Sequence, residues 1–215
     1  MESASAESFR DVAATTFQAV GPARIAVLTL LAIRDDDLAL PRRRKTVDMA
    51  VTRIDVAHAT LTARFPETLT RVGFLEPPEV KDSRIAAAEV LTPIFNALAD
   101  GAKPTRDVLG DTEAFRALCI DEVDPKVTRF LDIMMDALGS AQSEQDRRVR
   151  AETVKAVRSA TSVGRSIQVI SVNAAIEASR SGIHGRGFKV IAEEIRTLAD
   201  RTQAILGDVA RRLTE

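Results

Sequence analysis

The sequence predicts an all-α protein, and three observations support that prediction. Apolar residues recur at spacings of three and four along most of the chain, as they do in amphipathic helices. No segment alternates apolar and polar residues like a strand, and the strand-favouring residues tryptophan and tyrosine are absent. All eight prolines lie at or before Pro125, so only the C-terminal part is free to form long helices. We therefore expect an α-helical domain over residues 1–120 and a long antiparallel helical hairpin over residues 121–215.

Composition argues against several classes of function. Hydrophobic residues make up 45% of the chain and the formal net charge is -1, so the chain is not disordered and carries no basic field that would favour nucleic acid as a partner. The single cysteine, Cys119, cannot form an intramolecular disulfide and is expected to pack as a small apolar residue. With His58 and His184 as the only histidines, zinc-type ligation is not expected. We predict no cofactor, no metal and no catalytic residues.

The pattern at the N-terminus suggests a cytoplasmic protein. The first twelve residues are acidic and polar, unlike a signal peptide. The most apolar run, residues 25–33, would cover roughly 14 Å as a helix, about half the hydrocarbon thickness of a bilayer. This run therefore predicts a buried helix, and we expect no membrane insertion.

In the N-terminal part, three helices are predicted from apolar spacing, and residues 100–111 are predicted to form a loop. Pro93 leaves two alternatives for the third helix: a new helix with Thr92 as its N-cap, or one kinked helix. The basic run Arg42–Lys45 fits either an acidic-partner patch or, more simply, a solvated helix start. The helices are predicted from Phe9, Val12, Phe17 and Val20; from Met49, Val51, Ile54, Val56 and Leu61; and from Ile85, Val90, Leu91, Ile94, Phe95 and Leu98.

The hairpin is predicted from two helical patterns separated by a glycine-rich turn at residues 182–187. Asp124 is expected as an N-cap followed by Pro125 in the first helical turn, and the pattern then stays helical to about Ser181. The return helix shows a heptad seam, which predicts packing against the outgoing helix and, in a dimer, a four-helix bundle. The seam consists of Phe188, Ile191, Ile195, Leu198, Thr202, Ile205 and Val209.

Three glycines and one arginine define the predicted turn. Gly182 suits a left-handed helix C-terminus, and Gly185 and Gly187 are expected to reverse the chain with positive φ. Arg186 would then lie at the apex, where its guanidinium can bind carbonyl or carboxylate groups of a partner. The small residues before the turn would let other helices approach closely.

The stretch NAAIEASRSGIHGRGFKVIAEEIRTLADRT, which begins at Asn173, resembles the signalling tip of methyl-accepting chemotaxis proteins, the bacterial chemoreceptors. The resemblance covers under a third of the chain, at its C-terminal end. The matching positions are Asn173, Ala174, Ala175, Ile176, Glu177, Ala178, Arg180, Gly182, Gly185, Arg186, Gly187, Phe188, Val190, Glu194, Arg196, Leu198 and Ala199.

The resemblance implies a protein–protein signalling surface that engages the coupling protein CheW, the histidine kinase CheA and other chemoreceptor tips, in a homodimer. Glu177 and Arg180 lie three residues apart and can pair within the helix or across to a neighbour, whereas Glu194 and Arg196, two apart, would address different partners. We predict partner contact through Val169, Val172, Arg186 and Val190, and tip-to-tip pairing through Glu177, Arg180, Glu194 and Arg196.

The sequence also departs from the chemoreceptor pattern. Ser166 and Ile167 replace polar positions, Ile183 stands where the family often has an acidic residue, and Lys189 replaces a small residue. The return helix is much shorter than the outgoing one, and only Glu144–Gln145 offers a weak candidate for methylation. We therefore expect no methyl-accepting activity.

The leading hypothesis is a cytoplasmic chemotaxis signal-transduction protein without catalysis, in which residues 1–120 supply a sensory input or hold the hairpin. Two alternatives remain from the sequence. The chain could be a structural or scaffolding helical protein that kept the hairpin but lost its chemosensory partners. It could also sense a small ligand through its N-terminal helices.

Overall fold

A computed structural model describes residues 8–32, 41–99 and 112–214, and every element in these ranges is helical. This confirms the all-α prediction. The loop predicted at 100–111 lies outside the described residues. Contacts between residues divide the chain into two compact units, Met1–Ser143 (unit 1) and Glu144–Glu215 (unit 2). The domain boundary predicted near residue 120 stays a prediction.

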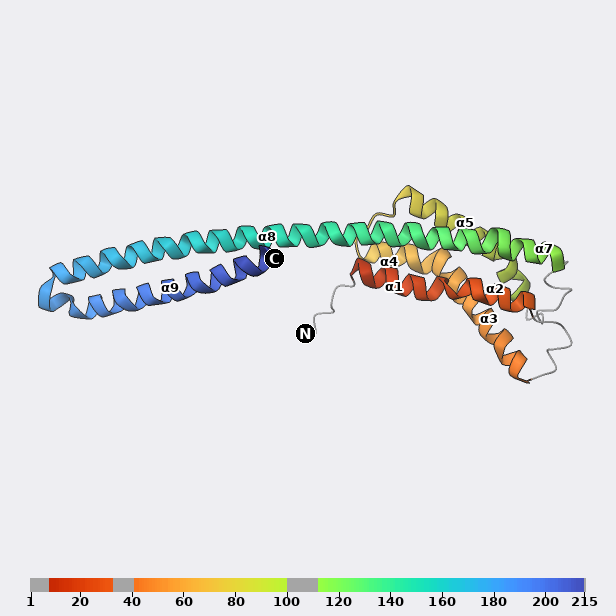
Figure 1. Cartoon of the computed structure of the whole chain (residues 1–215), viewed down its shortest axis with the longest axis horizontal. Coiled ribbons are helices and arrows are strands. Elements are labelled where there is room, and N and C mark those ends of the chain that lie inside the picture. The colour runs from red at the N-terminus through yellow and green to blue at the C-terminus, as the bar shows by residue number, and fades with distance from the viewer. Residues whose placement is uncertain (1–7, 33–40, 100–111, 215) are drawn as a thin grey trace. The chain divides into compact units, whose positions relative to one another are not determined.

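Unit 1 is a bundle of helices (Figure 1). Its elements are α1 (Phe9–Val20), α2 (Pro22–Ala32), α3 (Pro41–Ala59), α4 (Phe65–Arg71), α5 (Pro78–Ala99), α7 (Thr112–Ala117) and the first part of α8 (Asp124–Arg180).

Prolines explain where several of these helices begin. α2, α3 and α5 each start at a proline, whose fixed φ suits the first helical turn and whose missing N–H is not needed there. α1 instead has a capping box. The Ser8 hydroxyl accepts a hydrogen bond from the Asp11 amide at 3.2 Å, and the Ser8 amide donates to the Asp11 carboxylate at 3.1 Å. Arg42–Lys45 are exposed in the first turns of α3, which fits both a solvated helix start and an acidic-partner patch.

Two of the prolines within helical stretches each follow a π-helical turn. The π turn Thr60–Arg64 ends two residues before Pro66, and the π turn Leu118–Val123 ends two residues before Pro125. A proline removes one N–H and crowds the carbonyl four residues earlier, so a widened turn at this position relieves the clash. The N-cap role predicted for Asp124 is therefore wrong: its backbone is helical (φ -61, ψ -49), and the chain enters α8 from the π turn.

Pro93 lies inside α5 without interrupting it. The Thr92 hydroxyl donates to the carbonyl of Ala88 at 2.8 Å, one turn earlier, so it does not cap a new helix. Of the two alternatives at this position, a new helix start is wrong.

The core of unit 1 is built from large side chains of several helices. Phe65 and Phe130 are both buried and meet edge to face with ring centroids 5.6 Å apart. Ile54 of α3, Leu91 of α5 and Met134 of α8 belong to the same buried cluster. Cys119 is also buried in this core and burial raises the pKa of its thiol to about 11, which confirms its role as a small apolar residue.

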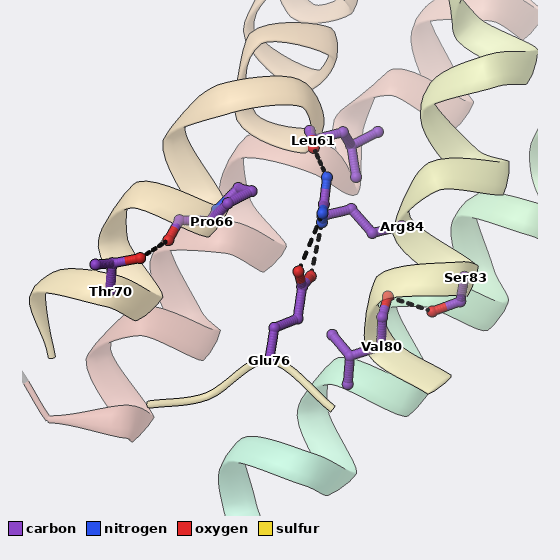
Figure 2. A network of polar contacts seen from close by, with 7 residues as sticks. All are labelled: Leu61, Pro66, Thr70, Glu76, Val80, Ser83 and Arg84. Atoms are coloured by element: carbon purple, nitrogen blue, oxygen red, sulfur yellow. Dashed lines mark hydrogen bonds and ion pairs between the residues drawn. The ribbon is translucent and has the colours of Figure 1, made fainter. Parts of the chain in front are cut away.

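A buried ion pair connects α5 to the π turn at Thr60–Arg64 (Figure 2). The Arg84 guanidinium donates to both carboxylate oxygens of Glu76, at 2.7 and 3.0 Å, and to the carbonyl of Leu61 at 2.7 Å. Leu61 lies in the π turn, where widening leaves a carbonyl without its usual helical partner. Arg84 therefore satisfies that carbonyl, and Glu76 compensates its charge.

One described stretch, Phe9–Ala32, is long and apolar enough to cross a membrane by length and composition alone. A core helix of a soluble protein or an N-terminal signal sequence has the same properties. Within α2, Ala26, Val27 and Leu30 are buried, whereas Ile25 and Leu28 are exposed. The burial predicted for residues 25–33 therefore holds for one side of this helix only, over residues 25–32, and residue 33 lies outside the described residues.

Candidate functional site

Unit 2 is an antiparallel helical hairpin (Figure 1). The last part of α8 leads through a short 3₁₀ turn, Gly182–Gly185, into α9 (Arg186–Thr214). This confirms the predicted hairpin and places its turn within residues 182–187.

Side-chain contacts fix the register of the two helices. The Arg150 guanidinium donates to the carbonyl of Leu213 at 2.6 Å, far from the turn. Nearer the turn, the Gln168 amide donates to the Asp200 carboxylate at 2.6 Å and accepts from the Gln203 amide at 3.3 Å.

The two helices meet along a seam of small residues spaced by seven. Each of these residues is buried, whereas most of their neighbours in unit 2 are not. Small side chains let two helices approach closely, so this spacing brings the backbones of α8 and α9 together. We call this set the small-residue seam; it consists of Gly164, Ser171, Ala178, Gly185, Ala192 and Ala199.

The large residues of α9 were predicted to pack against α8 within the hairpin, and this prediction is wrong. Phe188 is 70% exposed, and Ile191, Ile195 and Leu198 are exposed as well. Because the small and the large residues both repeat every seven positions, periodicity alone could not separate them. The small set lies between the helices, and the large set flanks it on the outside.

The exposed large residues of α9 share one side of the hairpin with apolar residues of α8. A shallow apolar groove is lined on α8 by Ala160, Val163 and Ile167, and on α9 by Ile195 and Leu198. Exposed apolar strips on soluble helical proteins are typical of surfaces that bind other proteins. We call this side the apolar face; it includes Val163, Ile167, Ile170, Phe188, Ile191, Ile195, Leu198, Ile205 and Val209.

The three turn glycines have different roles. Gly182 has φ 59, so the predicted left-handed conformation is confirmed there. The prediction of positive φ at Gly185 and Gly187 is wrong, because Gly73 and Gly182 are the only glycines with positive φ among the described residues. Gly185 is instead required by packing: a Cβ there would lie 1.8 Å from the carbonyl oxygen of Ala178. A Cβ at Gly187 would meet nothing within 4 Å.

The residues predicted for partner contact are mostly accessible. Val169, Val190 and Arg186 are exposed, whereas Val172 is half-buried. Arg186 is the first residue of α9, directly after the turn. Their role in partner contact stays a prediction.

The four residues predicted for tip-to-tip pairing are all exposed. The Arg180 guanidinium lies 3.5 Å from the Glu177 carboxylate, so this pair forms within the helix, one of the two arrangements that the spacing allowed. Glu194 and Arg196 lie on α9 and form no ion pair with each other among the described contacts. Pairing between tips stays a prediction for all four.

Sequence reasoning missed the small-residue seam and the cross-helix contacts of Gln168. The seam could have been found from the spacing of Gly164, Ser171 and Ala178, which are small residues seven apart. The Gln168 contacts carry no comparable signal, because they depend on the register that the turn imposes. Within the described residues, no group of three or more His, Cys, Asp or Glu side chains could hold a metal ion.

Comparison with known proteins identifies the C-terminal region. Residues 124–214 match the family described as the methyl-accepting chemotaxis protein (MCP) signalling domain. This match identifies residues 124–214, which are less than half of the chain, as a signalling domain of that kind. No solved structure matches the chain at a significant level.

Several curated chemoreceptors are similar to parts of the chain. The methyl-accepting chemotaxis protein CtpL of Pseudomonas aeruginosa is 39% identical over 72 residues, which is 33% of this chain and 11% of CtpL. CtpM of the same organism is 36% identical over 104 residues, 48% of this chain and 16% of CtpM. PscA of Pseudomonas syringae pv. tomato is 46% identical over 55 residues, 26% of this chain and 9% of PscA. The chain thus covers less than a fifth of the length of these relatives.

Proposed function

We propose that this chain, with a methyl-accepting chemotaxis protein signalling domain over residues 124–214, transmits a chemotaxis signal through the tip of its hairpin. The tip would bind the coupling protein CheW and the histidine kinase CheA, or the tips of other chemoreceptors. It acts as a binding surface, without catalysis of its own, in the cytoplasm. Residues 1–120 would supply the input or hold the hairpin.

The observation that carries this proposal is the construction of the turn. Gly182 and Gly185 fix the backbone, one by its left-handed φ and the other by contact with Ala178. Arg186 follows directly, exposed and without a hydrogen bond or ion pair among the described residues. A guanidinium held at a rigid apex is suited to bind carboxylate or carbonyl groups of a protein partner.

The apolar face supports a second part of the proposal, that two copies of the chain pair through their hairpins. Large apolar residues from both helices lie exposed along one side of the hairpin, with the same heptad spacing as the small-residue seam. Two such faces are self-complementary across a twofold axis and would form a four-helix bundle. Pairing would remove this apolar surface from water.

The test measures binding of the purified full chain to purified coupling protein by titration calorimetry. Arg186→Ala is expected to weaken binding by about tenfold or more, because it removes a charged contact at the centre of the surface. Glu177→Ala is expected to weaken assembly with receptor tips. Arg201→Ala, an exposed arginine of α9 away from the turn, is the matched control and should bind as the wild type does.

The outcomes separate the proposal from its alternatives. If the wild-type chain does not bind the coupling protein, the proposed function is wrong and a structural role for the hairpin is favoured. If it binds and Arg186→Ala behaves like Arg201→Ala, the function stands and the assignment of Arg186 is wrong.

A further inference from the structure

We propose that unit 1 binds the surface of an anionic lipid bilayer, through the outward side of α1 and α2 and the basic run at the start of α3. Apolar side chains of the two helices would enter the bilayer interface, and the cations would contact the phosphate headgroups. Membrane binding of this kind concerns unit 1 alone and is independent of what the hairpin tip binds.

The outward side of α1 and α2 carries no charged side chain beyond the first turn of α1. The two helices follow each other in unit 1, separated only by Gly21 (Figure 1). Arg24 is the one charged residue between Val12 and Ala32, and it is half-buried against α8. Its guanidinium donates to the Thr128 hydroxyl at 2.6 Å and lies 3.3 Å from the Asp124 carboxylate. We call the exposed residues of this side the α1–α2 face; they are Ala14, Thr15, Phe17, Gln18, Ile25, Leu28 and Ala32.

The α1–α2 face differs from the outward side of another helix of the same unit. On α5, four charged residues are exposed: Glu79, Lys81, Asp82 and Glu89. A helix that borders water normally has such a charged side. On the α1–α2 face, Phe17 is 51% exposed and Ile25 is 61% exposed, with no charge between them to interact with water. Single exposed apolar residues are ordinary, but an uncharged side that extends over two helices favours contact with an apolar medium.

The same two helices have the length and composition of a segment that enters a bilayer. Phe9–Ala32 meets this description, and 33% of its apolar stretch is buried inside the protein. The buried part includes Val20, Val27 and Leu30, which belong to the core of unit 1 and are not available to lipid. Helices that are packed on one side and apolar on the other can lie in the bilayer interface, but they cannot span the membrane while unit 1 is folded.

Charge complementarity favours an anionic membrane. α3 packs against α2 and begins with Arg42–Lys45, all of which are exposed. Residues 34–45 contain five cations and three aspartates, so the net charge of this segment is positive. An apolar helix side next to a group of cations is the combination by which peripheral proteins bind acidic phospholipids. The bilayer surface thus provides the acidic partner that the basic run fits.

The experiment measures cosedimentation of the purified full chain with phosphatidylcholine vesicles that contain or lack phosphatidylglycerol. The wild type should bind the phosphatidylglycerol vesicles about tenfold or more tightly than the neutral ones, and added salt should reduce this preference. The triple variant Arg42→Gln, Arg44→Gln, Lys45→Gln should lose about tenfold or more of the affinity for the anionic vesicles, because three cations no longer meet the headgroups.

A matched triple variant controls for the loss of positive charge. Arg147→Gln, Arg158→Gln, Arg165→Gln removes three exposed cations of α8 in unit 2 and changes the net charge of the chain by the same amount. It should bind the anionic vesicles within about threefold of the wild type. Equal losses in the two triple variants would overturn the assignment to the start of α3.

The apolar contact is tested by the double variant Ile25→Asp, Leu28→Asp. Two carboxylates would then enter the bilayer interface, so binding to the anionic vesicles should weaken by about tenfold or more. The control is Leu75→Asp, which makes the same kind of change at a leucine that is 91% exposed between α4 and α5. Leu75→Asp should bind as the wild type does, and circular dichroism should show all variants folded.

The outcomes distinguish membrane binding from other roles of this face. A wild type without preference for anionic vesicles would overturn the inference. If, in addition, the wild type self-associates in sedimentation equilibrium and the Ile25→Asp, Leu28→Asp variant does not, the face is an interface between copies. Arg186→Ala should bind vesicles as the wild type does. Failure of the proposed tip function would therefore leave this inference intact, and the reverse also holds.

Discussion

Unit 1 and the hairpin both consist of helices, but they bury opposite kinds of side chain. Unit 1 encloses phenylalanine, isoleucine, leucine and methionine from several helices. The hairpin encloses glycine, serine and alanine and leaves its phenylalanine and its isoleucines exposed. Large buried side chains contribute most of the stability that a fold gains from its own core. Unit 1 is therefore expected to be stabilised from within, and the hairpin by whatever covers its apolar face.

The largest expected effect tests this comparison with one phenylalanine from each unit. Phe130 is fully buried against Phe65, so Phe130→Ala should lower the free energy of unfolding of unit 1 by about 3–5 kcal/mol. Phe188 is 70% exposed, so Phe188→Ala should change that same transition by less than about 0.5 kcal/mol. Calorimetry with circular dichroism can follow the transitions, since the chain has no tryptophan or tyrosine. Equal losses in the unit 1 transition would contradict the comparison.

The next effect concerns the turn, where two glycines close in sequence should respond with opposite signs. Gly185→Ala forces a Cβ into the carbonyl of Ala178 and should destabilise the hairpin by about 2–3 kcal/mol. Gly187→Ala meets nothing within 4 Å and lies in α9, where alanine favours the helix by up to about 1 kcal/mol. Thermal unfolding of the hairpin checks both. A Gly185→Ala chain as stable as Gly187→Ala would show that the close contact is not required.

A third, somewhat smaller effect tests the small-residue seam itself. Ala192→Leu enlarges a buried position between α8 and α9 and should cost about 1–3 kcal/mol through overpacking. Ala204→Leu makes the same change at an exposed position of the same helix, where leucine and alanine differ little in helix propensity. The difference between the two melting temperatures is the measurement. If Ala192→Leu stabilised the hairpin instead, the seam would not be the surface between the two helices.

The fold class and the hairpin could be predicted from the sequence because they depend on local patterns. Heptad spacing, the position of the prolines and the glycine turn all act over one or two helical turns. Local patterns could not predict which face of each helix packs against the other helix. Phe188 and Ala192 each belong to a set of positions that repeats with the heptad. Only the close approach of α8 to α9 decides that Ala192 is buried and Phe188 is exposed.

The site shows the same limit. Gly182 was predictable because a left-handed helix terminus is a local property of the backbone. The reason for Gly185 was not, since it depends on the carbonyl of Ala178 across the turn. Asp124 was misassigned for a related reason: the sequence signature of an N-cap before proline is the same as that of a proline following a π turn inside a helix.

The smallest expected effect is a pH dependence confined to unit 1. The His58 ring stacks on Phe95 with centroids 4.2 Å apart, and its Nε2 lies 3.1 Å from the Thr92 hydroxyl. Burial lowers the pKa of His58 below its ordinary value of 6.5, and the nearby charge of Asp55 opposes this shift only in part.

The unfolded chain therefore takes up the proton more readily than the folded one. The contribution of His58 to stability is fully present above pH 6.5 and declines as the pH falls below that value. His58→Phe keeps an aromatic ring against Phe95 and removes the titration, so its unit 1 melting temperature should fall less than that of the wild type between pH 7.5 and pH 5.5. The wild type and His58→Phe share every other titratable group. The difference between their two profiles of melting temperature against pH is therefore caused by His58. Parallel profiles would mean that the ring is as accessible to protons in the folded chain as in the unfolded one.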